Sequence, residues 1–239
     1  MIKVIIPLGG SSELFASAGY FYPKPLIEVK GKPMIELVLE NPMAICQEKH
    51  FIFIVKEDDC NKFHLDNTLK ILCPGSSIIR LKNDTRGGLC SVLMAIDEID
   101  PNDSLLILNG DQLIDRNLNE IINFWKDLNV DAGLVTFKSV HPRWSYARVI
   151  DGNVVQTAEK NPISNSAIAG VYYFNDAGTF FNSAFNTIKN DVQLDGKFYI
   201  SPVINDLVLN NKTIIPFHID SKEYHLFYSP QVLQEYERN

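Results

Sequence analysis

The first feature of the chain that suits chemistry is a glycine loop at residues 7–15, which reads Pro-Leu-Gly-Gly-Ser-Ser-Glu-Leu-Phe. It follows a short apolar run, residues 2–8, that is typical of a buried strand. A glycine loop after a strand lets backbone N–H groups approach a phosphate closely. Gly9, Gly10 and Ser11 are therefore candidates for nucleotide binding. The alternative is an ordinary tight connection between two elements, because such connections use the same residue types.

Lys24 lies in a second stretch, residues 22–35, which reads Tyr-Pro-Lys-Pro-Leu-Ile-Glu-Val-Lys-Gly-Lys-Pro-Met-Ile. The prolines on both sides of Lys24 hold the backbone extended and stiff, so the ammonium group is aimed in one direction. A fixed lysine near a glycine loop suits a phosphate site. The alternative is a surface loop with solvated lysines, which the density of Pro-Lys-Pro and Gly-Lys-Pro in one short stretch disfavours.

Asp111 belongs to a third stretch, residues 109–112, which reads Asn-Gly-Asp-Gln and follows the apolar run 105–108. In open α/β sheets, ligands bind at the carboxyl ends of strands. An aspartate at such an end, behind a glycine that lets a ligand come close, is a candidate ligand for Mg²⁺. The alternative is an Asx turn or a helix cap.

The elements around these stretches alternate between strands and helices in the first half of the chain. The hydrophobic pattern predicts strands at residues 2–8, 51–55, 78–81 and 104–108, and helices at 33–45, 62–72, 89–99 and 117–128. Continuous apolar strands between amphipathic helices predict a parallel sheet that is covered on both faces.

The second half of the chain contains more strands. We predict strands at residues 132–138, 147–150, 154–159, 167–174 and 214–219, and helices at 177–189, 202–209 and 230–237. Asp151-Gly152-Asn153 is typical of a hairpin turn. We therefore predict one α/β domain over residues 1–239, in which a mixed central sheet has helices on both faces. Its nucleotide-binding half covers about residues 1–130, and its acceptor-binding half covers about residues 131–239.

Composition excludes several other classes of protein. The chain has 239 residues, of which 46% are hydrophobic and 21% charged, so it is long and apolar enough to bury a sizeable core. This usage excludes collagen, low-complexity disorder and disulfide-stapled domains. The net charge of −7 disfavours nucleic acid as a partner, since broad nucleic-acid binding needs a basic surface.

The cysteines and the N-terminus predict a cytoplasmic protein. Cys46, Cys60, Cys73 and Cys90 show no spacing of a zinc site or redox motif, so we expect buried free thiols in a reducing compartment. The first apolar run is too short for a signal peptide, and no run approaches the roughly 20 residues that span a bilayer.

Five blocks, in this order, resemble the sugar-1-phosphate nucleotidyltransferase family: residues 5–10, 22–35, 109–112, 158–164 and 167–174. Residues 141–147, His-Pro-Arg-Trp-Ser-Tyr-Ala, are similar to the branch found with bacterial capsule and surface-polysaccharide enzymes. The resemblance covers nearly the whole chain and implies a Rossmann-like nucleotidyltransferase fold of the GT-A type.

The resemblance also implies an activity. It is the Mg²⁺-dependent joining of an NTP to a sugar 1-phosphate, or to a small phosphorylated alcohol or amide, with release of pyrophosphate. The product would serve capsule or surface-polysaccharide biosynthesis. A homo-oligomer follows from the resemblance alone, because dimers and tetramers are usual in the family.

Roles for single residues follow from the same resemblance. Gly9, Gly10 and Ser11 would hold the nucleotide, Lys24 would contact phosphate, and Asp111 would bind the metal ion. In the segment 85–91, Gly88 and Ser91 would lie nearest the base. The residues expected at the acceptor are Tyr146, Glu159, Lys160, Gly170 and Lys197. Lys24, Asp111 and Lys160 would be the catalytic residues, with Arg86 as a further cation.

The glycine loop departs from the family pattern at three positions. Leu14 stands where an arginine contacts the nucleotide phosphates, and Ser12 stands where a glycine allows close approach. Glu13 adds a negative charge beside the expected phosphate site. Loss of one stabilising donor costs about 10²–10³ in rate in other enzymes.

The C-terminal part departs as well. Tyr228 replaces a glycine, and Leu226 stands about where some branches have a metal-binding aspartate, with Asp220 nearby as a weaker candidate. Lys197 replaces a glutamate that binds sugar hydroxyls, which implies either a more anionic acceptor or no such contact.

Three functions are therefore compatible with the residues. The first is an active nucleotidyltransferase with an altered triphosphate loop, which Lys24, Asp111, Glu159 and Lys160 favour. The second is a non-catalytic protein that binds a nucleotide or sugar phosphate, which the departures favour. The third is a glycosyltransferase that uses a nucleotide sugar; we rank it last, because residues 109–111 lack the first carboxylate of an Asp-x-Asp motif.

Overall fold

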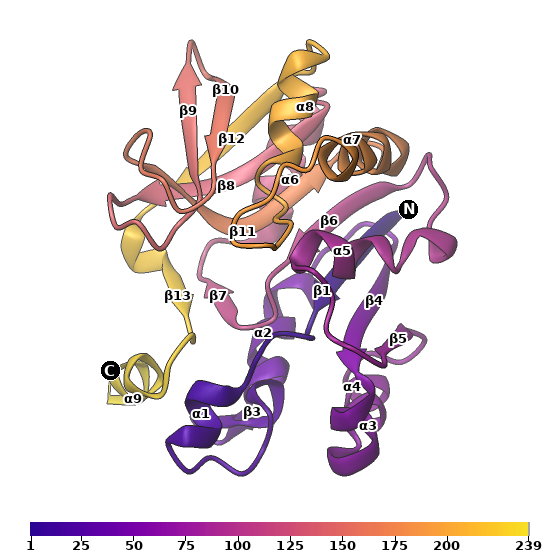
Figure 1. Ribbon diagram of the computed structural model, residues 1–239, viewed down its shortest axis with the longest axis vertical. Coiled ribbons are helices and arrows are strands. Elements are labelled where there is room, and N and C mark those ends of the chain that lie inside the picture. The colour runs from indigo at the N-terminus through magenta and orange to yellow at the C-terminus, as the bar shows by residue number, and fades with distance from the viewer. Residues whose placement is uncertain (239) are drawn as a thin grey trace.

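A mixed sheet of nine strands organises the protein (Figure 1). The structure, a computed structural model, describes residues 1–238. The main path of the sheet runs β10-β9-β11-β6-β1-β4-β5, and β8 and β12 extend it from β11. The predicted α/β class and the mixed central sheet are confirmed.

The first half of the chain forms the parallel part of the sheet. β1 (Ile2–Pro7) lies between β4 (Lys49–Lys56) and β6 (Ser104–Leu108), and β5 (Ser77–Leu81) pairs with β4. All three pairings are parallel, so the carboxyl ends of β1, β4 and β6 meet at the same edge.

The second half adds the antiparallel part. β11 (Ser166–Phe174) pairs antiparallel with β6 and with β8 (Ala132–Lys138), and β12 (Ile214–Ile219) runs parallel to β8. β9 (Tyr146–Ile150) and β10 (Asn153–Ala158) form the predicted hairpin. Asp151 and Gly152 have φ of 49° and 80°, which is the geometry of a type I′ turn.

Helices cover both faces of this sheet. Two hydrophobic clusters form the core, one on each face of the sheet. Alternate residues of β1 belong to different clusters, with Val4 and Ile6 in one and Ile5 in the other. The first cluster includes residues of α2 (Met34–Met43), α4 (Leu65–Leu72) and α6 (Leu118–Asp127). The second includes residues of α5 (Gly88–Leu93), α7 (Ala177–Lys189) and α8 (Val203–Leu209). Further helices are α1 (Glu13–Ser17), α3 (Glu57–Phe63) and α9 (Pro230–Arg238).

Two small ribbons lie outside the main sheet. β2 (Glu28–Val29) pairs with β3 (Lys32–Pro33), and β7 (Gln112–Ile114) pairs with β13 (Tyr224–Leu226). The β7–β13 pair brings the C-terminal segment beside the strand end that carries Asp111, as the left side of Figure 1 shows. Short 3₁₀ helices occur at Lys24–Leu26, Ile96–Glu98 and Ser221–Glu223.

Three local predictions were wrong. The helix expected at 62–72 is divided into α3 and α4, because His64 adopts a left-handed φ of 56° and ends α3. The helix expected at 89–99 ends at Leu93 and continues as a 3₁₀ turn. Cys46 is exposed, whereas Cys60 and Cys73 are buried and Cys90 is partly buried. None of the helices in residues 1–238 is long and apolar enough to cross a membrane.

The packing of Trp125 against β8 supports a test of the fold. A Cβ atom added at Gly133 would lie 2.2 Å from the indole ring of Trp125, which is fully buried and donates a hydrogen bond to the Ile215 carbonyl (2.9 Å). We expect Gly133→Ala to lower the free energy of unfolding by about 1–3 kcal/mol, because a packed core resists added volume. Urea denaturation measures the change. Gly10→Ala, where the added atom meets nothing within 4 Å, is the matched control, and equal losses in both variants would contradict the packing argument.

Candidate functional site

A large cavity opens at the carboxyl edge of the parallel strands. It has a volume of about 920 Å³. Its lining comes from the end of β1 and the glycine loop, from Lys56 at the end of β4, and from Asn109, Gly110 and Asp111 after β6. This is the position at which open α/β sheets bind ligands. The predicted nucleotide-binding residues Gly9, Gly10, Ser11, Gly88 and Ser91 all line it.

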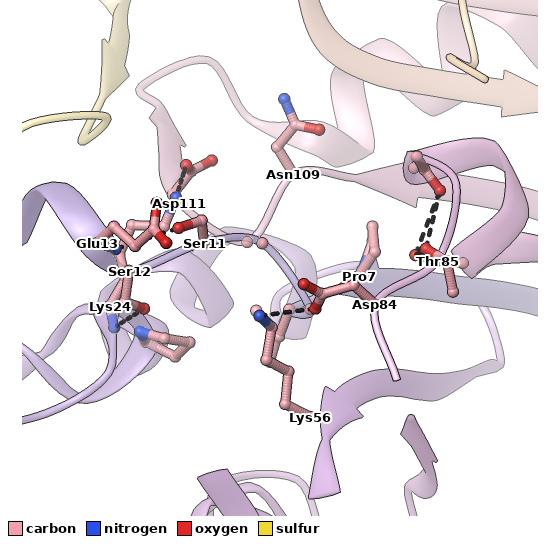
Figure 2. Close-up of a pocket in the computed structure, with 18 of the residues that line it drawn as sticks. Pro7, Ser11, Ser12, Glu13, Lys24, Lys56, Asp84, Thr85, Asn109 and Asp111 are labelled. Atoms are coloured by element: carbon pink, nitrogen blue, oxygen red, sulfur yellow. Dashed lines mark hydrogen bonds and ion pairs between the residues drawn. The ribbon is translucent and has the colours of Figure 1, made fainter. Parts of the chain in front are cut away.

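Lys24 and Asp111 meet on one side of this cavity (Figure 2). The Lys24 Nζ lies 2.5 Å from the Asp111 Oδ2, and each side chain is 19% exposed. The Lys24 backbone N–H donates to the Ser12 Oγ (2.9 Å), and the Asp111 carbonyl accepts a hydrogen bond from the Phe227 N–H (2.8 Å). Backbone hydrogen bonds therefore hold the segments of both residues in place. Lys24 and Asp111, which were selected as candidates from separate stretches of the sequence, form one ion pair.

Lys56 and Asp84 form a second ion pair across the cavity (Figure 2), and the sequence analysis did not include them. The Lys56 Nζ lies 2.9 Å from the Asp84 Oδ1. The hydrogen bond and the charge of Lys56 hold the pKa of Asp84 below its ordinary value, and Lys197 lowers it further. Lys56 directly follows the strand predicted at residues 51–55, so the strand-end rule that selected Asp111 as a candidate also applied to Lys56.

The charges that line this cavity balance. The lining contains three cations, Lys24, Lys56 and Lys197. It also contains three carboxylates, Glu13, Asp84 and Asp111. Lys24 and Lys56 are each paired with a carboxylate. A bound polyphosphate would therefore meet no excess of positive charge unless a further cation bound with it.

The segment 85–91 is fixed in shape by Gly87. Gly87 has a φ of 107°, and a Cβ atom there would lie 2.3 Å from the Phe198 carbonyl oxygen. The Ser91 Oγ lies 2.6 Å from the Thr85 Oγ1, and Gly88 and Ser91 both face the cavity as predicted. Arg86 does not line the cavity, contrary to expectation, because its guanidinium lies over the Phe198 ring, 5.1 Å from the centroid.

A smaller cavity of about 330 Å³ adjoins the first. Both are lined by Gly88, Asn109, Tyr199 and Leu226. The predicted acceptor residues Glu159 and Gly170 line the smaller one. The Glu159 Oε2 accepts hydrogen bonds from the Ser201 Oγ (2.7 Å) and from the Ser145 Oγ, so its carboxylate is held in one orientation.

The backbone at Gly170 explains why glycine occupies the wall of the smaller cavity. Its φ is 62°, and a Cβ atom would lie 2.1 Å from the Asn109 Nδ2. The Gly170 carbonyl accepts hydrogen bonds from the Asn109 N–H (3.2 Å) and from the Gln112 Nε2 (3.1 Å). Gly170 thus fixes the segment after β6 that contains Asp111.

Three predicted acceptor residues lie elsewhere. Tyr146 is fully buried outside both cavities, because its hydroxyl donates to the His141 carbonyl (2.6 Å). Lys160 also lies outside both linings. Its ammonium donates to the Tyr199 hydroxyl (3.1 Å), and this hydrogen bond raises the pKa of Lys160. Lys197 lines the larger cavity rather than the smaller one.

A divalent metal ion fits at Asp111 if water and phosphate oxygens supply most of its ligands. The Lys24 ammonium is paired with the Oδ2 of Asp111, which shows that this oxygen is placed to contact a cation. Residues 1–238 contain no group of three His, Cys, Asp or Glu side chains that could hold a metal ion. Leu226 lines both cavities without an oxygen, and Asp220 is used as the cap of a 3₁₀ helix. Mg²⁺ retains water and phosphate ligands more readily than other ions, so one carboxylate suits it.

Comparison with protein families identifies one match. The family model described as "Nucleotidyl transferase" matches residues 3–199. Among curated proteins, the bifunctional protein GlmU of Pseudothermotoga lettingae is 29% identical over 193 residues, which cover 76% of this chain and 40% of that protein. The chain therefore spans about 40% of the length of that relative. UTP–glucose-1-phosphate uridylyltransferase AglF of Haloferax volcanii is 23% identical over 204 residues, covering 83% of this chain and 80% of that protein.

Solved structures with the same fold cover the whole chain. The nucleoside-diphosphate-sugar pyrophosphorylase of Vibrio cholerae RC9 has a TM-score of 0.85 and 24% identity, and each chain is covered completely. The inositol-1-phosphate CTP transferase of T. maritima has a TM-score of 0.76 and 14% identity, and covers 98% of this chain and 93% of that one. At these identities the likeness establishes the fold, which is the Rossmann-like nucleotidyltransferase fold expected from the sequence.

Competition for Asp111 gives a test of the site. Because the Lys24 ammonium lies on the Asp111 carboxylate, we expect Lys24→Met to bind Mn²⁺ more tightly than the wild type when no nucleotide is present. The Kd should fall by about tenfold or more, which corresponds to at least ~1.4 kcal/mol. Titration of Mn²⁺ by electron paramagnetic resonance measures the change.

The control for this test is Lys32→Met, because Lys32 pairs with Glu40 (2.8 Å) and does not line either cavity. A Lys24→Met protein with the wild-type Kd for Mn²⁺ would show that the ammonium and the metal ion do not compete.

Proposed function

This chain belongs to the nucleotidyl transferase family, and from that premise we propose that it joins an NTP to a sugar 1-phosphate or another small phosphorylated acceptor. Pyrophosphate is the second product. The observation that carries the proposal is that the larger cavity, with the Lys24–Asp111 pair, shares Asn109 and Leu226 with a smaller cavity. Two substrates bound in adjoining cavities can react at the shared wall.

The larger cavity is proposed to bind the NTP. The backbone of Gly9, Gly10 and Ser11 would face the phosphates, and Gly88 and Ser91 would face the base. The names of the relatives support this assignment, since AglF uses UTP and the T. maritima enzyme uses CTP.

The smaller cavity is proposed to bind the acceptor. Glu159 lies in it with its carboxylate fixed by two serine hydroxyls, so it can accept hydrogen bonds from acceptor hydroxyl groups. The volume of about 330 Å³ fits a single small molecule. The name of AglF gives glucose 1-phosphate as the acceptor of that relative. We propose the same class of acceptor for this chain.

The proposed reaction needs charge neutralisation and positioning, and it needs no nucleophilic side chain. An oxygen of the acceptor phosphate attacks the α-phosphorus of the NTP, and the bond from that phosphorus to the oxygen of the β-phosphate breaks. The electron pair of the broken bond leaves with pyrophosphate. The lining charges of the larger cavity sum to zero, so Mg²⁺ held at Asp111 would supply the positive charge that the side chains lack. Lys24 would then leave Asp111 and contact the phosphates.

The division of the chain into two halves is retained as part of the proposal. The larger cavity is lined mainly by residues between 7 and 111, and the smaller one mainly by residues between 143 and 226. We also propose a role in bacterial capsule or surface-polysaccharide assembly, in the cytoplasm and as a homo-oligomer. The motif at residues 141–147 and the four free cysteines support that setting.

A non-catalytic binding protein is the second candidate function. Leu14 is 62% exposed and does not line the larger cavity. The Leu226 side chain supplies no oxygen at the wall shared by the two cavities. Both observations favour a protein that binds its ligands without joining them.

Pyrophosphate release separates the two functions. The protein is incubated with Mg²⁺, each of the four NTPs or dTTP, and a panel of sugar 1-phosphates and small phosphorylated acceptors. We expect release that requires one NTP and one acceptor, and that falls about 10²-fold or more in Asp111→Asn, because a charged group at the transferring phosphate is lost. The control is Asp127→Asn, at the exposed end of α6. Saturable NTP binding without release over the whole panel would favour the binding protein.

A further inference from the structure

The smaller cavity contains one cation, and it is not the lysine expected from the sequence. Among the described residues that line this cavity, Arg143 is the single lysine or arginine, and Glu159 is the other charged residue. Lys160 lies outside the lining and donates to Tyr199. A phosphorylated acceptor in this cavity therefore has Arg143 as its available counter-ion.

Arg143 is held by aromatic rings rather than by a carboxylate. Its guanidinium lies over the Tyr228 ring, 4.5 Å from the centroid, and over the Trp144 ring at 5.7 Å. Its Nε donates to the His141 Nδ1 (3.2 Å), and its Nη2 lies 3.4 Å from the His141 Nε2. Within residues 1–238 no ion pair includes Arg143, in contrast to Lys24 and Lys56. Stacking fixes the plane of a guanidinium and leaves its N–H groups able to donate to a ligand.

Tyr228 belongs to the segment that forms part of the wall shared by the two cavities, and its own side chain lines neither of them. Phe227 donates its N–H to the Asp111 carbonyl (2.8 Å), and Leu226 lines both cavities. Tyr228 is the next residue of the same segment. The guanidinium of Arg143 therefore rests on the segment whose preceding residues contact Asp111 and line both cavities.

We propose that Arg143 binds the phosphate group of the acceptor, and that Tyr228 is the residue that positions it. The planar fork of a guanidinium matches two oxygens of a phosphate. The assignment makes a phosphate on the acceptor a requirement for binding, whereas the rest of the cavity, with Glu159 and several aromatic rings, suits the uncharged part. This inference rests on the proposed function, because it concerns the acceptor of that reaction.

Kinetics of Arg143 variants test the assignment. With the best substrate pair of the wild type, we expect Arg143→Gln to raise the KM for the acceptor about 10- to 100-fold and to change the KM for the NTP less than about twofold, because a charge-assisted hydrogen bond is lost. Arg143→Lys should keep part of the affinity. The matched control is Arg148→Gln, an exposed arginine of β9 that lines neither cavity.

A comparison of two Tyr228 variants tests whether the ring of this residue positions Arg143. Tyr228→Phe keeps the ring and should keep the wild-type KM for the acceptor, whereas Tyr228→Leu should raise it. Thermal denaturation of each variant identifies any that is not folded. Equal KM values for the acceptor in Arg143→Gln and the wild type, or an equal rise of both KM values, would overturn the assignment.

Direct binding keeps this inference separate from the proposed function. Calorimetric titration uses glucose 1-phosphate and glycerol 3-phosphate, with glucose and glycerol as the uncharged counterparts. We expect the wild type to bind at least one of the phosphorylated compounds more tightly than its counterpart, and Arg143→Gln to lose that difference. A wild type that shows this binding but releases no pyrophosphate would refute the proposed reaction and leave the role of Arg143 standing. Arg143→Gln binding as tight as wild type, or no binding of either phosphorylated compound, would refute the role of Arg143.

Discussion

The ion pair between Lys24 and Asp111 is the contact on which the geometry of the site depends. It joins two segments that are 87 residues apart, with the Nζ 2.5 Å from the carboxylate. The Lys24 segment is stiffened by its two prolines and is attached to the glycine loop through Ser12. The Asp111 segment is held between β6 and the β7–β13 ribbon. Each segment is held by its own backbone contacts, and the ion pair links the glycine loop to the wall shared by the two cavities.

That contact also explains how an acidic protein can present a phosphate site. The chain has a net charge of −7, and the charges around the larger cavity cancel because Lys24 and Lys56 are paired. Because each of these lysines is paired with a carboxylate, the repulsion between the two ammonium groups is offset. If the cavity binds an NTP as proposed, the phosphates would take these lysines from their carboxylates, and a metal ion at a released carboxylate would make that exchange favourable. Binding of the NTP and of the metal ion would then be coupled.

Long helices and strands with a clear hydrophobic periodicity could be predicted from the sequence. Contacts between segments far apart in the sequence could not. β8, α7 and β12 have the predicted bounds, because each has an uninterrupted hydrophobic pattern. β7 and β13 were missed because three residues are too few for a pattern, and their pairing depends on the tertiary fold. Asp111 was selected as a candidate because ligands of open α/β sheets bind at the carboxyl ends of strands. Lys160 was assigned to the acceptor by position alone, and the contact of its ammonium with Tyr199 could not be deduced without the fold.

The departures from the family pattern are consistent with a redistribution of positive charge between the two cavities. Leu14 provides no charge to the larger cavity and is 62% exposed, so nothing at that position contacts a ligand there. In the smaller cavity, Tyr228 supplies the ring on which Arg143 rests. The larger cavity thus lacks the cation expected at position 14, whereas the smaller cavity contains a cation at Arg143. Less of the charge of a nucleotide, and more of the charge of an acceptor phosphate, would be neutralised by side chains. In the proposed reaction, the nucleotide would then depend more on Lys24 and a metal ion, and the acceptor would depend more on Arg143.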